Sequence, residues 1–205
     1  MRLSFIFGAI ALVGAVQATE YTFSIGATTI PTEGVTSPSP LLFNVAGLDG
    51  NISAVRFRFN GLSHDFPDDI GALLVNPNGS TTILFDGPGG GDPLVNVDWL
   101  FDDAGSASLA DSGANPSGTY KPGQNEYGDV FTGAPLGAYG TDFGVHSGTS
   151  GIGAWQLFVE DFVIGEGGEF DSADLLITTT PVPEPATLAA LGLGAVALIR
   201  KRRKN

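Results

Sequence analysis

Short apolar runs separated by turn-forming residues constrain the fold of this chain more than any other feature. The chain has 30 glycines and 13 prolines among its 205 residues. Between residues 19 and 180 no stretch shows the 3.6-residue period of an amphipathic helix. Residues 21–26 and 55–60 instead alternate apolar and polar side chains, which is typical of strands with one buried face. The pattern predicts an all-β fold, a two-sheet antiparallel sandwich.

Other segments are expected to form strands or the connections between them. The clearest hairpin flanks Asn76-Pro77-Asn78-Gly79, where Pro77 presets a turn and Gly79 can take a positive φ. Residues 32–40, with prolines inside and before them, read as a loop, and residues 104–132 read as a long connection. Strands are expected over 41–45, 70–75, 81–85, 94–101, 155–159 and 170–177.

The N-terminal end has the pattern of a secretory signal peptide over residues 1–18. Arg2 precedes an apolar run over residues 3–13, and small residues follow at Val16 and Ala18. A signal peptidase is expected to cut after Ala18. The segment 19–180 then remains, which is enough for one domain with a real hydrophobic core.

The C-terminal end, residues 181–205, has three parts in a fixed order. A Pro-Glu-Pro triplet comes first, then an apolar run over residues 186–199, and then a basic cluster. As a helix the run would span roughly 21 Å, less than the ~30 Å hydrocarbon core of a bilayer, so we expect a transient membrane stop. The positive-inside bias would keep the cations cytoplasmic and the preceding chain outside. The residues concerned are Pro183, Glu184 and Pro185 of the triplet and Arg200, Lys201, Arg202, Arg203 and Lys204 of the cluster.

This order of triplet, apolar helix and basic end resembles the PEP-CTERM sorting tail of Gram-negative bacteria that make extracellular polysaccharide. The resemblance implies that an exosortase, a membrane enzyme, recognises Pro183-Glu184-Pro185 and cuts nearby. The protein would then be anchored transiently in the inner membrane and end at the cell surface or outside the cell. The alternatives are an ordinary C-terminal anchor helix and a buried core helix. A buried helix that ends in five consecutive charges would have nowhere to place them.

The charge of the central segment excludes one class of partner. Residues 19–180 contain three basic side chains, Arg56, Arg58 and Lys121, against 21 acidic ones, a formal balance of −18. Nucleic acid is excluded as a natural partner because phosphate binding needs a basic surface. Divalent cations, basic surfaces or solubility remain as explanations. Cysteine is absent, so the chain has neither disulfides nor a thiol nucleophile.

A second set of motifs runs through residues 55–177. Its positions are His64, Asp69-Ile70, Pro77, Gly79, Ser80, Phe101-Asp102-Asp103-Ala104, Gly118-Thr119-Tyr120-Lys121-Pro122, Gly153-Ala154-Trp155-Gln156-Leu157, Gly168, Phe170, Leu175 and Ile177. In their order and spacing these residues look like the P domain, or Homo B domain, that follows the catalytic domain of proprotein convertases. The resemblance implies an eight-stranded jelly roll without chemistry of its own, one that accompanies a subtilisin-like protease. Ala173 departs from the pattern, because the family has tryptophan there, so we expect the core around it to be filled differently.

No catalytic residue is predicted. His64 and His146 lie in no nucleophile motif such as Gly-x-Ser-x-Gly. Glu160 and Asp161 are adjacent on a strand and would face opposite ways, so they cannot form a glycosidase pair across a cleft.

Loop acids are the candidate ligands for Ca²⁺, which accepts six to eight oxygen ligands with loose geometry. The alternative is that they are solvated loop acids and turn caps. Tyr120, Tyr127 and Tyr139 lie in loop-like sequence and could stack on a sugar, or only hold their loops. The calcium candidates are Asp65, Asp68 and Asp69, then Asp102 and Asp103, then Asp161, Glu166, Glu169 and Asp171.

Together these observations predict an exported protein that is not an enzyme. We expect it to be a structural or binding component of the exopolysaccharide matrix or the envelope. Two alternatives remain open. One is a calcium-dependent module that binds a glycan, and the other is an accessory domain acting with a separate subtilisin-like serine endopeptidase.

Overall fold

The computed structural model describes residues 17–124 and 126–181, together with Gly192, Gly194, Ile199, Arg200 and Arg202. Most of the predicted signal peptide, the Pro-Glu-Pro triplet and most of the C-terminal tail lie outside the described residues. Among the residues that are described, no helix is long and apolar enough to cross a membrane.

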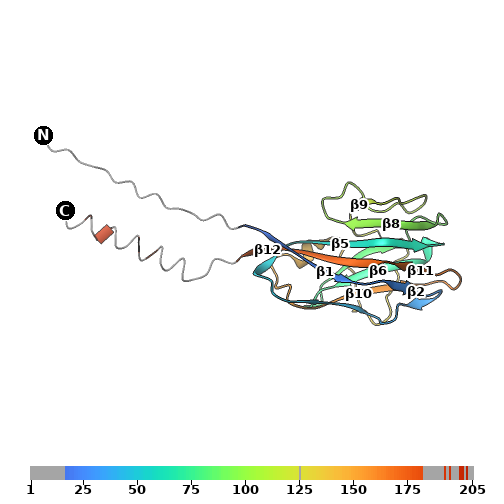
Figure 1. Cartoon of the computed structure of the whole chain (residues 1–205), viewed down its shortest axis with the longest axis horizontal. Coiled ribbons are helices and arrows are strands. Elements are labelled where there is room, and N and C mark those ends of the chain that lie inside the picture. The colour runs from blue at the N-terminus through green and yellow to red at the C-terminus, as the bar shows by residue number, and fades with distance from the viewer. Residues whose placement is uncertain are drawn as a thin grey trace.

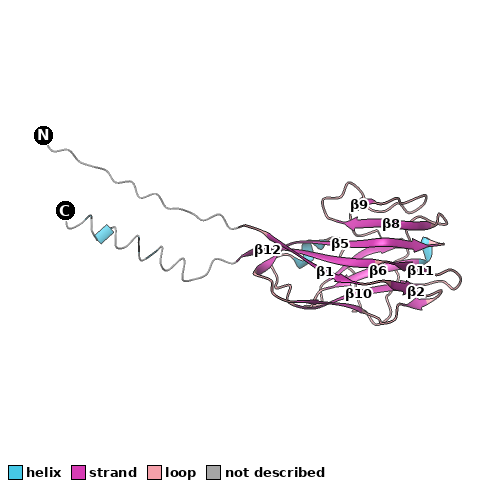
Figure 2. Ribbon diagram, in the orientation of Figure 1, coloured by secondary structure: helices cyan, strands magenta, loops and turns pink. Residues whose placement is uncertain are grey.

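The described residues between 17 and 181 are built from strands, with two short 3₁₀ helices, η1 (Pro67–Asp69) and η2 (Phe143–His146) (Figure 2). The all-β prediction is confirmed. The strands are β1 (Thr19–Ile25), β2 (Thr28–Ile30), β3 (Gly34–Val35), β4 (Leu41–Val45), β5 (Gly50–His64), β6 (Ile70–Val75), β7 (Thr81–Asp86), β8 (Leu94–Phe101), β9 (Gly118–Tyr120), β10 (Gly153–Asp161), β11 (Gly168–Phe170) and β12 (Ser172–Pro181).

The strands form two sheets that pack face to face (Figure 1). In the larger sheet β5 pairs with β12, β11 and β8, while β1 and β2 pair with β12 and β11 on the outside. In the smaller sheet β10 pairs with β3, β4 and β6, and β6 pairs with β7. All of these pairs are antiparallel, whereas β8 and β9 are parallel. The predicted two-sheet sandwich is therefore present.

The resemblance implies eight strands, whereas twelve are present in the described part of the chain. The difference comes mainly from short breaks and additions. The ladder of β1 with β12 and the ladder of β2 with β11 are two parts of one interrupted ladder at the edge of the sheet. In addition, two short strands lie in segments that were expected to be irregular. These are β3, within residues 32–40, and β9, within residues 104–132.

Aromatic side chains fill the space between the sheets. Phe57 and Phe59 of β5 are fully buried, with ring centroids 5.1 Å apart, and Phe85 of β7 lies 5.9 Å from Phe59. Trp99 of β8 extends the chain of rings, 5.4 Å from Phe85. Such edge-to-face pairs add to the free energy of burial. The predicted alternation in β5 is confirmed, because Arg56 and Arg58 lie on its other, partly exposed face.

Strands β6 and β7 of the smaller sheet are buried on both faces. Ala72 and Leu74 of β6 face the core between the sheets, whereas Leu73 and Val75 belong to a second cluster with Phe131. The loop that carries Phe131 therefore covers the outer face of this sheet. This explains why β6 is a continuous apolar run without alternation, since neither of its faces meets water.

One irregular position in β8 was not predicted. Asn96 in β8 has φ = 51°, which shifts the strand's phase, so that Leu94 is buried but Val95 is 75% exposed. Ala173, where the P-domain pattern has tryptophan, is fully buried. It lies opposite Phe59 and Ile25 in the neighbouring strands. Phe170 occupies the nearby core, 5.2 Å from Phe59, so an aromatic ring from the preceding strand fills this region.

Candidate functional site

The two ends of the sandwich carry different segments of the chain. β1 begins at Thr19 beside the end of β12, and Thr19 pairs with Thr179. The first strand of the sandwich therefore begins at the same end at which the last strand finishes (Figure 1). The opposite end, which we call the distal end, carries β2, β11, the end of β5 and the loop from β10 to β11.

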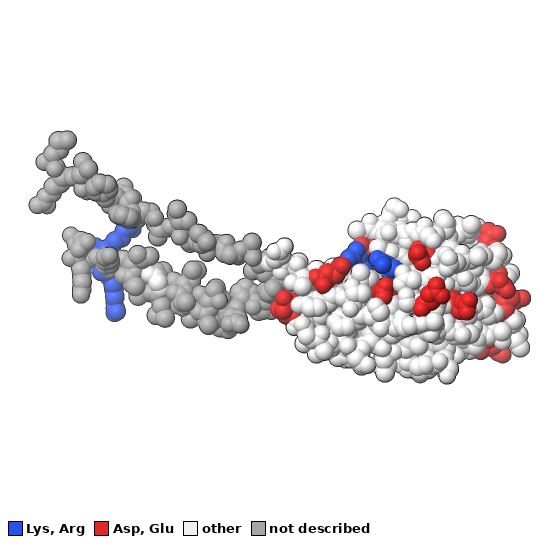
Figure 3. All heavy atoms as spheres, viewed as in Figure 1, with Lys and Arg blue, Asp and Glu red and all other residues white. Residues whose placement is uncertain are grey.

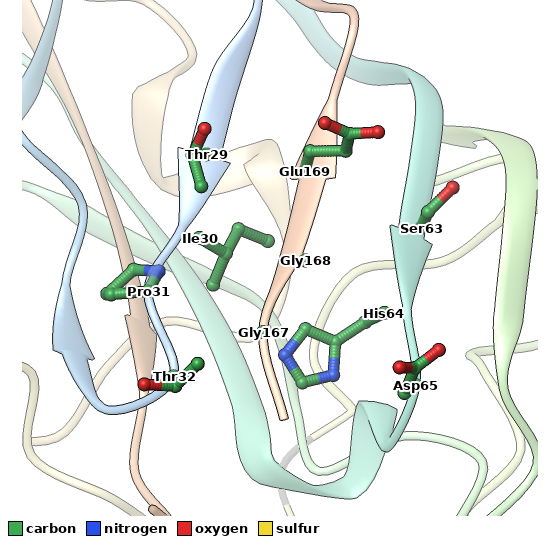
Figure 4. Close-up of a pocket in the computed structure, with 10 residues that line it drawn as sticks. All are labelled: Thr29, Ile30, Pro31, Thr32, Ser63, His64, Asp65, Gly167, Gly168 and Glu169. Atoms are coloured by element: carbon green, nitrogen blue, oxygen red, sulfur yellow. The ribbon is translucent and has the colours of Figure 1, made fainter. Parts of the chain in front are cut away.

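An open groove of about 420 Å³ lies at the distal end (Figure 4). It runs across β2, β11 and the end of β5. Its lining is mainly apolar surface, to which hydroxyl groups and two exposed carboxylates add polar atoms. The lining residues are Thr29, Ile30, Pro31, Thr32, Ser63, His64, Asp65, Gly167, Gly168 and Glu169.

Close approach of β11 to β5 shapes the floor of the groove. Gly168 pairs with His64, and Figure 4 shows the His64 ring beside Gly167 and Gly168. A Cβ on Gly168 would lie 2.3 Å from the Ser63 carbonyl oxygen and 2.5 Å from His64 Cδ2. Glycine is therefore required here, because any side chain would push the two strands apart.

His64 is buried under the groove and both of its ring nitrogens are bonded. The Phe66 backbone N–H donates to Nδ1 at 3.2 Å, so Nδ1 carries no proton. Nε2 therefore donates to Asp161 Oδ2, also at 3.2 Å. A catalytic histidine needs a nitrogen that can take a proton from a nucleophile or a water. His64 has none free, so the pair holds the end of β5 to the end of β10.

Burial raises the pKa of the Asp161 carboxyl group, while the hydrogen bonds from Val163 and His64 act in the opposite direction. Burial also raises the pKa of Asp69, and the charge of Asp161 adds to this effect. The structure thus brings together acids from two predicted clusters. Asp161 accepts from His64 and from the Val163 N–H at 3.0 Å, which occupies both of its oxygens.

The second histidine, His146, is also buried. The Thr82 hydroxyl donates to the Asp142 carbonyl oxygen at 2.9 Å, so the 2.9 Å contact with His146 is donated by Nε2–H. Nδ1 is buried with no hydrogen-bond partner, and the ring packs 5.0 Å from Trp155. Burial lowers its pKa to about 4. This ring is a core residue, with no open site around it.

The predicted calcium clusters do not converge. Within the described residues, no group of three or more His, Asp or Glu side chains is arranged as a metal site requires. Asp65, Glu166, Glu169 and Asp171 are exposed at the distal end. Figure 3 shows acidic side chains along that end of the sandwich. Calcium binding stays a prediction.

Other predicted acids and tyrosines hold loops in place. Asp103 accepts from the Phe143 N–H at 2.9 Å, and Asp102 accepts from the Ala104 N–H at the same distance. Asp68 accepts from the Tyr127 hydroxyl at 2.8 Å. The groove lining contains none of the three candidate tyrosines among its described residues. The Tyr120 hydroxyl donates to the Pro116 carbonyl oxygen, and Tyr139 packs 5.8 Å from Phe131.

Sequence reasoning missed the groove and the His64–Asp161 pair. The two residues are 97 positions apart, and only the pairing of β5, β10 and β11 joins them. The adjacent glycines Gly167 and Gly168 were the one available signal, because paired glycines beside a strand can mark a close backbone approach.

Comparison with known proteins gives a family match for one segment of the sequence and several similar solved structures, two of which are described here. No curated protein matches the sequence. A serine protease of Aeromonas sobria in complex with a chaperone aligns with 15% identity and a TM-score of 0.41, over 81% of this chain and 28% of the protease. The serine protease of Aeromonas sobria alone aligns with 14% identity and a TM-score of 0.40, over 80% and 27%. This chain thus spans about a quarter of their length.

The family match falls on the C-terminal tail. Residues 181–204 match the model of the PEP-CTERM protein-sorting motif. This motif indicates an exported protein that an exosortase processes at the membrane on its way to the cell surface. The chain therefore combines an all-β sandwich with a PEP-CTERM protein-sorting motif that begins at the last residue of β12.

Proposed function

We propose that this protein is a component of the extracellular polysaccharide matrix or of the cell envelope, and that it binds polysaccharide at the distal groove without catalysing a reaction. The observation that carries the proposal is the position of the groove. It lies at the end of the sandwich opposite the sorting motif, so attachment through the C-terminal end would leave it facing away from the membrane.

The lining suits a ligand that carries many hydroxyl groups. Thr29, Thr32 and Ser63 offer hydroxyl groups, while Asp65 and Glu169 offer carboxylate oxygens that can accept from sugar hydroxyls. Pro31 adds an apolar surface beside them. Small polar ligands are commonly held by a few convergent polar groups in a concave, partly apolar site.

The charge of the groove and of the whole sandwich limits which polysaccharides can bind. The described residues that line the groove include no lysine or arginine, and residues 19–180 carry a formal charge of −18. An acidic polymer would therefore be repelled unless divalent cations bridge it to the protein. A neutral polymer, or one with amino groups, would bind without such a bridge.

A role other than catalysis is supported by the two histidines of the chain. Both ring nitrogens of His64 are bonded, and His146 is enclosed in the core. A general base must reach the proton that it removes, which neither ring can do in this fold.

The test is cosedimentation of the purified protein with the host's extracellular polysaccharide, in calcium and then in chelator. We expect saturable binding that falls at least about tenfold when Asp65→Asn and Glu169→Gln are combined, because both carboxylates accept from the ligand. Asp92→Asn is the matched control, since it removes an exposed negative charge outside the groove lining. Loss of binding in chelator would show bridging by calcium. Absence of saturable binding in both buffers would contradict the proposal.

A further inference from the structure

One carboxylate holds both ends of the folded sandwich. Asp49, just before β5, accepts from the Thr179 hydroxyl at 2.6 Å and from the Thr19 hydroxyl at 3.5 Å. Hydrogen bonding from Thr179 is the main cause that lowers the pKa of Asp49. Thr179 itself is fully buried. We call Asp49, Thr19 and Thr179 the terminal clasp.

Strand pairing continues from the clasp to the sorting motif. After a shift in register between Thr178 and Thr179, residues 179–181 of β12 pair with residues 50–52 of β5. The last of these pairs joins Pro181 to Gly50. Only Val182 separates Pro181 from Pro183, the first residue of the triplet.

This spacing places the sandwich very near the point of processing. Two residues of extended chain span about 7 Å. The two sheets alone are about 10 Å apart, before their outer side chains are counted. An enzyme that encloses the triplet and the residues before it would collide with the sandwich, and its peptide would still be hydrogen-bonded to β5.

We propose that the last rungs of β12 act as a gate for exosortase processing. The enzyme reaches the triplet only after residues 179–181 separate from β5 and Thr179 separates from Thr19 of β1. The terminal clasp sets how often this opening occurs. The register shift confines the opening to these three residues, because regular pairing resumes at Thr178. Local openings of this kind at strand ends need far less free energy than global unfolding. The inference rests on the processing that the PEP-CTERM motif indicates, and is independent of the groove.

A first experiment weakens the clasp. Thr179→Val keeps the shape of the buried side chain but removes the hydroxyl that donates to Asp49. We expect the precursor to be processed roughly threefold to tenfold faster in pulse-chase labelling, the effect of one lost hydrogen bond on the opening equilibrium. Ser24→Ala is the matched control, because it removes a 2.6 Å bond from a hydroxyl to Asp174 at the other end of the same strand pair. Equal rates for both variants and the wild type would overturn the proposal.

A second experiment locks the gate. Asn51 and Thr180 are direct partners, so Asn51→Cys with Thr180→Cys has the spacing of a disulfide, and the chain has no other cysteine to compete. The oxidised precursor should be processed at least about tenfold more slowly, because the open state is lost, and reductant should restore the rate. Each single-cysteine variant controls for the substitution itself.

Two outcomes separate this inference from the other proposals. Processing of the oxidised lock at the wild-type rate would refute the gate, whatever the groove binds. Cosedimentation with polysaccharide should be the same for the lock and for Thr179→Val as for the wild type, because the groove lies at the other end. A wild-type chain that is never processed would contradict both the gate and the sorting role of the motif.

Discussion

Replacing Phe131 with alanine should destabilise the whole sandwich, although Phe131 lies in a loop. Its side chain is 1% exposed and packs with Leu73, Val75, Ile83 and Phe158 on the outer face of the smaller sheet. Its ring also lies 5.4 Å from Phe162 and 5.8 Å from Tyr139. The loop is therefore part of a second core.

The expected loss of unfolding free energy follows from the area that the Phe131 side chain buries. A phenylalanine that buries about 200 Å² contributes roughly 5 kcal/mol at 25 cal/mol per Å². Measured truncations of buried phenylalanine cost about 3–5 kcal/mol. With a denaturant slope near 2 kcal/mol per molar urea, the midpoint should fall by about 2 M.

The assay is equilibrium urea unfolding followed by tryptophan fluorescence, since Trp99 and Trp155 are both buried in the main core. Val130→Ala is the control, because the neighbouring side chain is 62% exposed and its loss should change stability by less than about 0.5 kcal/mol. A Phe131→Ala midpoint equal to that of Val130→Ala would refute the reasoning, because it would mean that the loop is not coupled to the sandwich.

Two further predictions concern single buried residues. Stability should fall by up to about 3 kcal/mol as the pH drops from about 6.5 to about 4, because the unfolded chain binds a proton at His146 that the native core excludes. His146→Gln should remove this loss of stability, as measured by melting at several pH values. The raised pKa values of Asp69 and Asp161 stabilise both proteins as the pH falls, so they do not alter the difference between them. Parallel curves of stability against pH for the two proteins would contradict the prediction. Ala173→Trp should lower the melting temperature by about 5 °C through overpacking, since Phe59 and Phe170 already fill that space, and calorimetry showing a higher temperature would refute this.

Much of the fold could be predicted from local sequence because the relevant signals are local. Alternation in residues 55–60 specified the buried face of β5, and the Asn76-Pro77-Asn78-Gly79 turn specified the hairpin of β6 and β7. Gly79 has φ = 88°, as its place in the turn requires. The limits of β4 also agree with the expected strand, since every second residue of Leu41–Val45 is buried.

The sequence indicated which residue types could form the candidate site, but not which of them lie together. Asp65 and Glu169 were predicted as candidate calcium ligands in two different clusters. The groove joins them, and Glu169 lies in β11 instead of a loop. Asp161 was grouped with the same acids, whereas its position in β10 turns it inward to His64. A strand residue faces the core or the solvent according to register, which depends on the partner strand.

The sequence by itself determined the strand class, the excess of acidic charge and the sorting motif, because each depends on residue type and on spacing along a few neighbouring positions. The tertiary structure alone decided that the groove lies at the end of the sandwich away from Thr19 and Thr179, that the loop with Phe131 forms part of a second core, and that Asp49 joins the first and last strands. These features join residues as far apart as Thr19 and Thr179. Contacts over such separations exist only after the sheets have paired, so no local pattern along the chain could encode them.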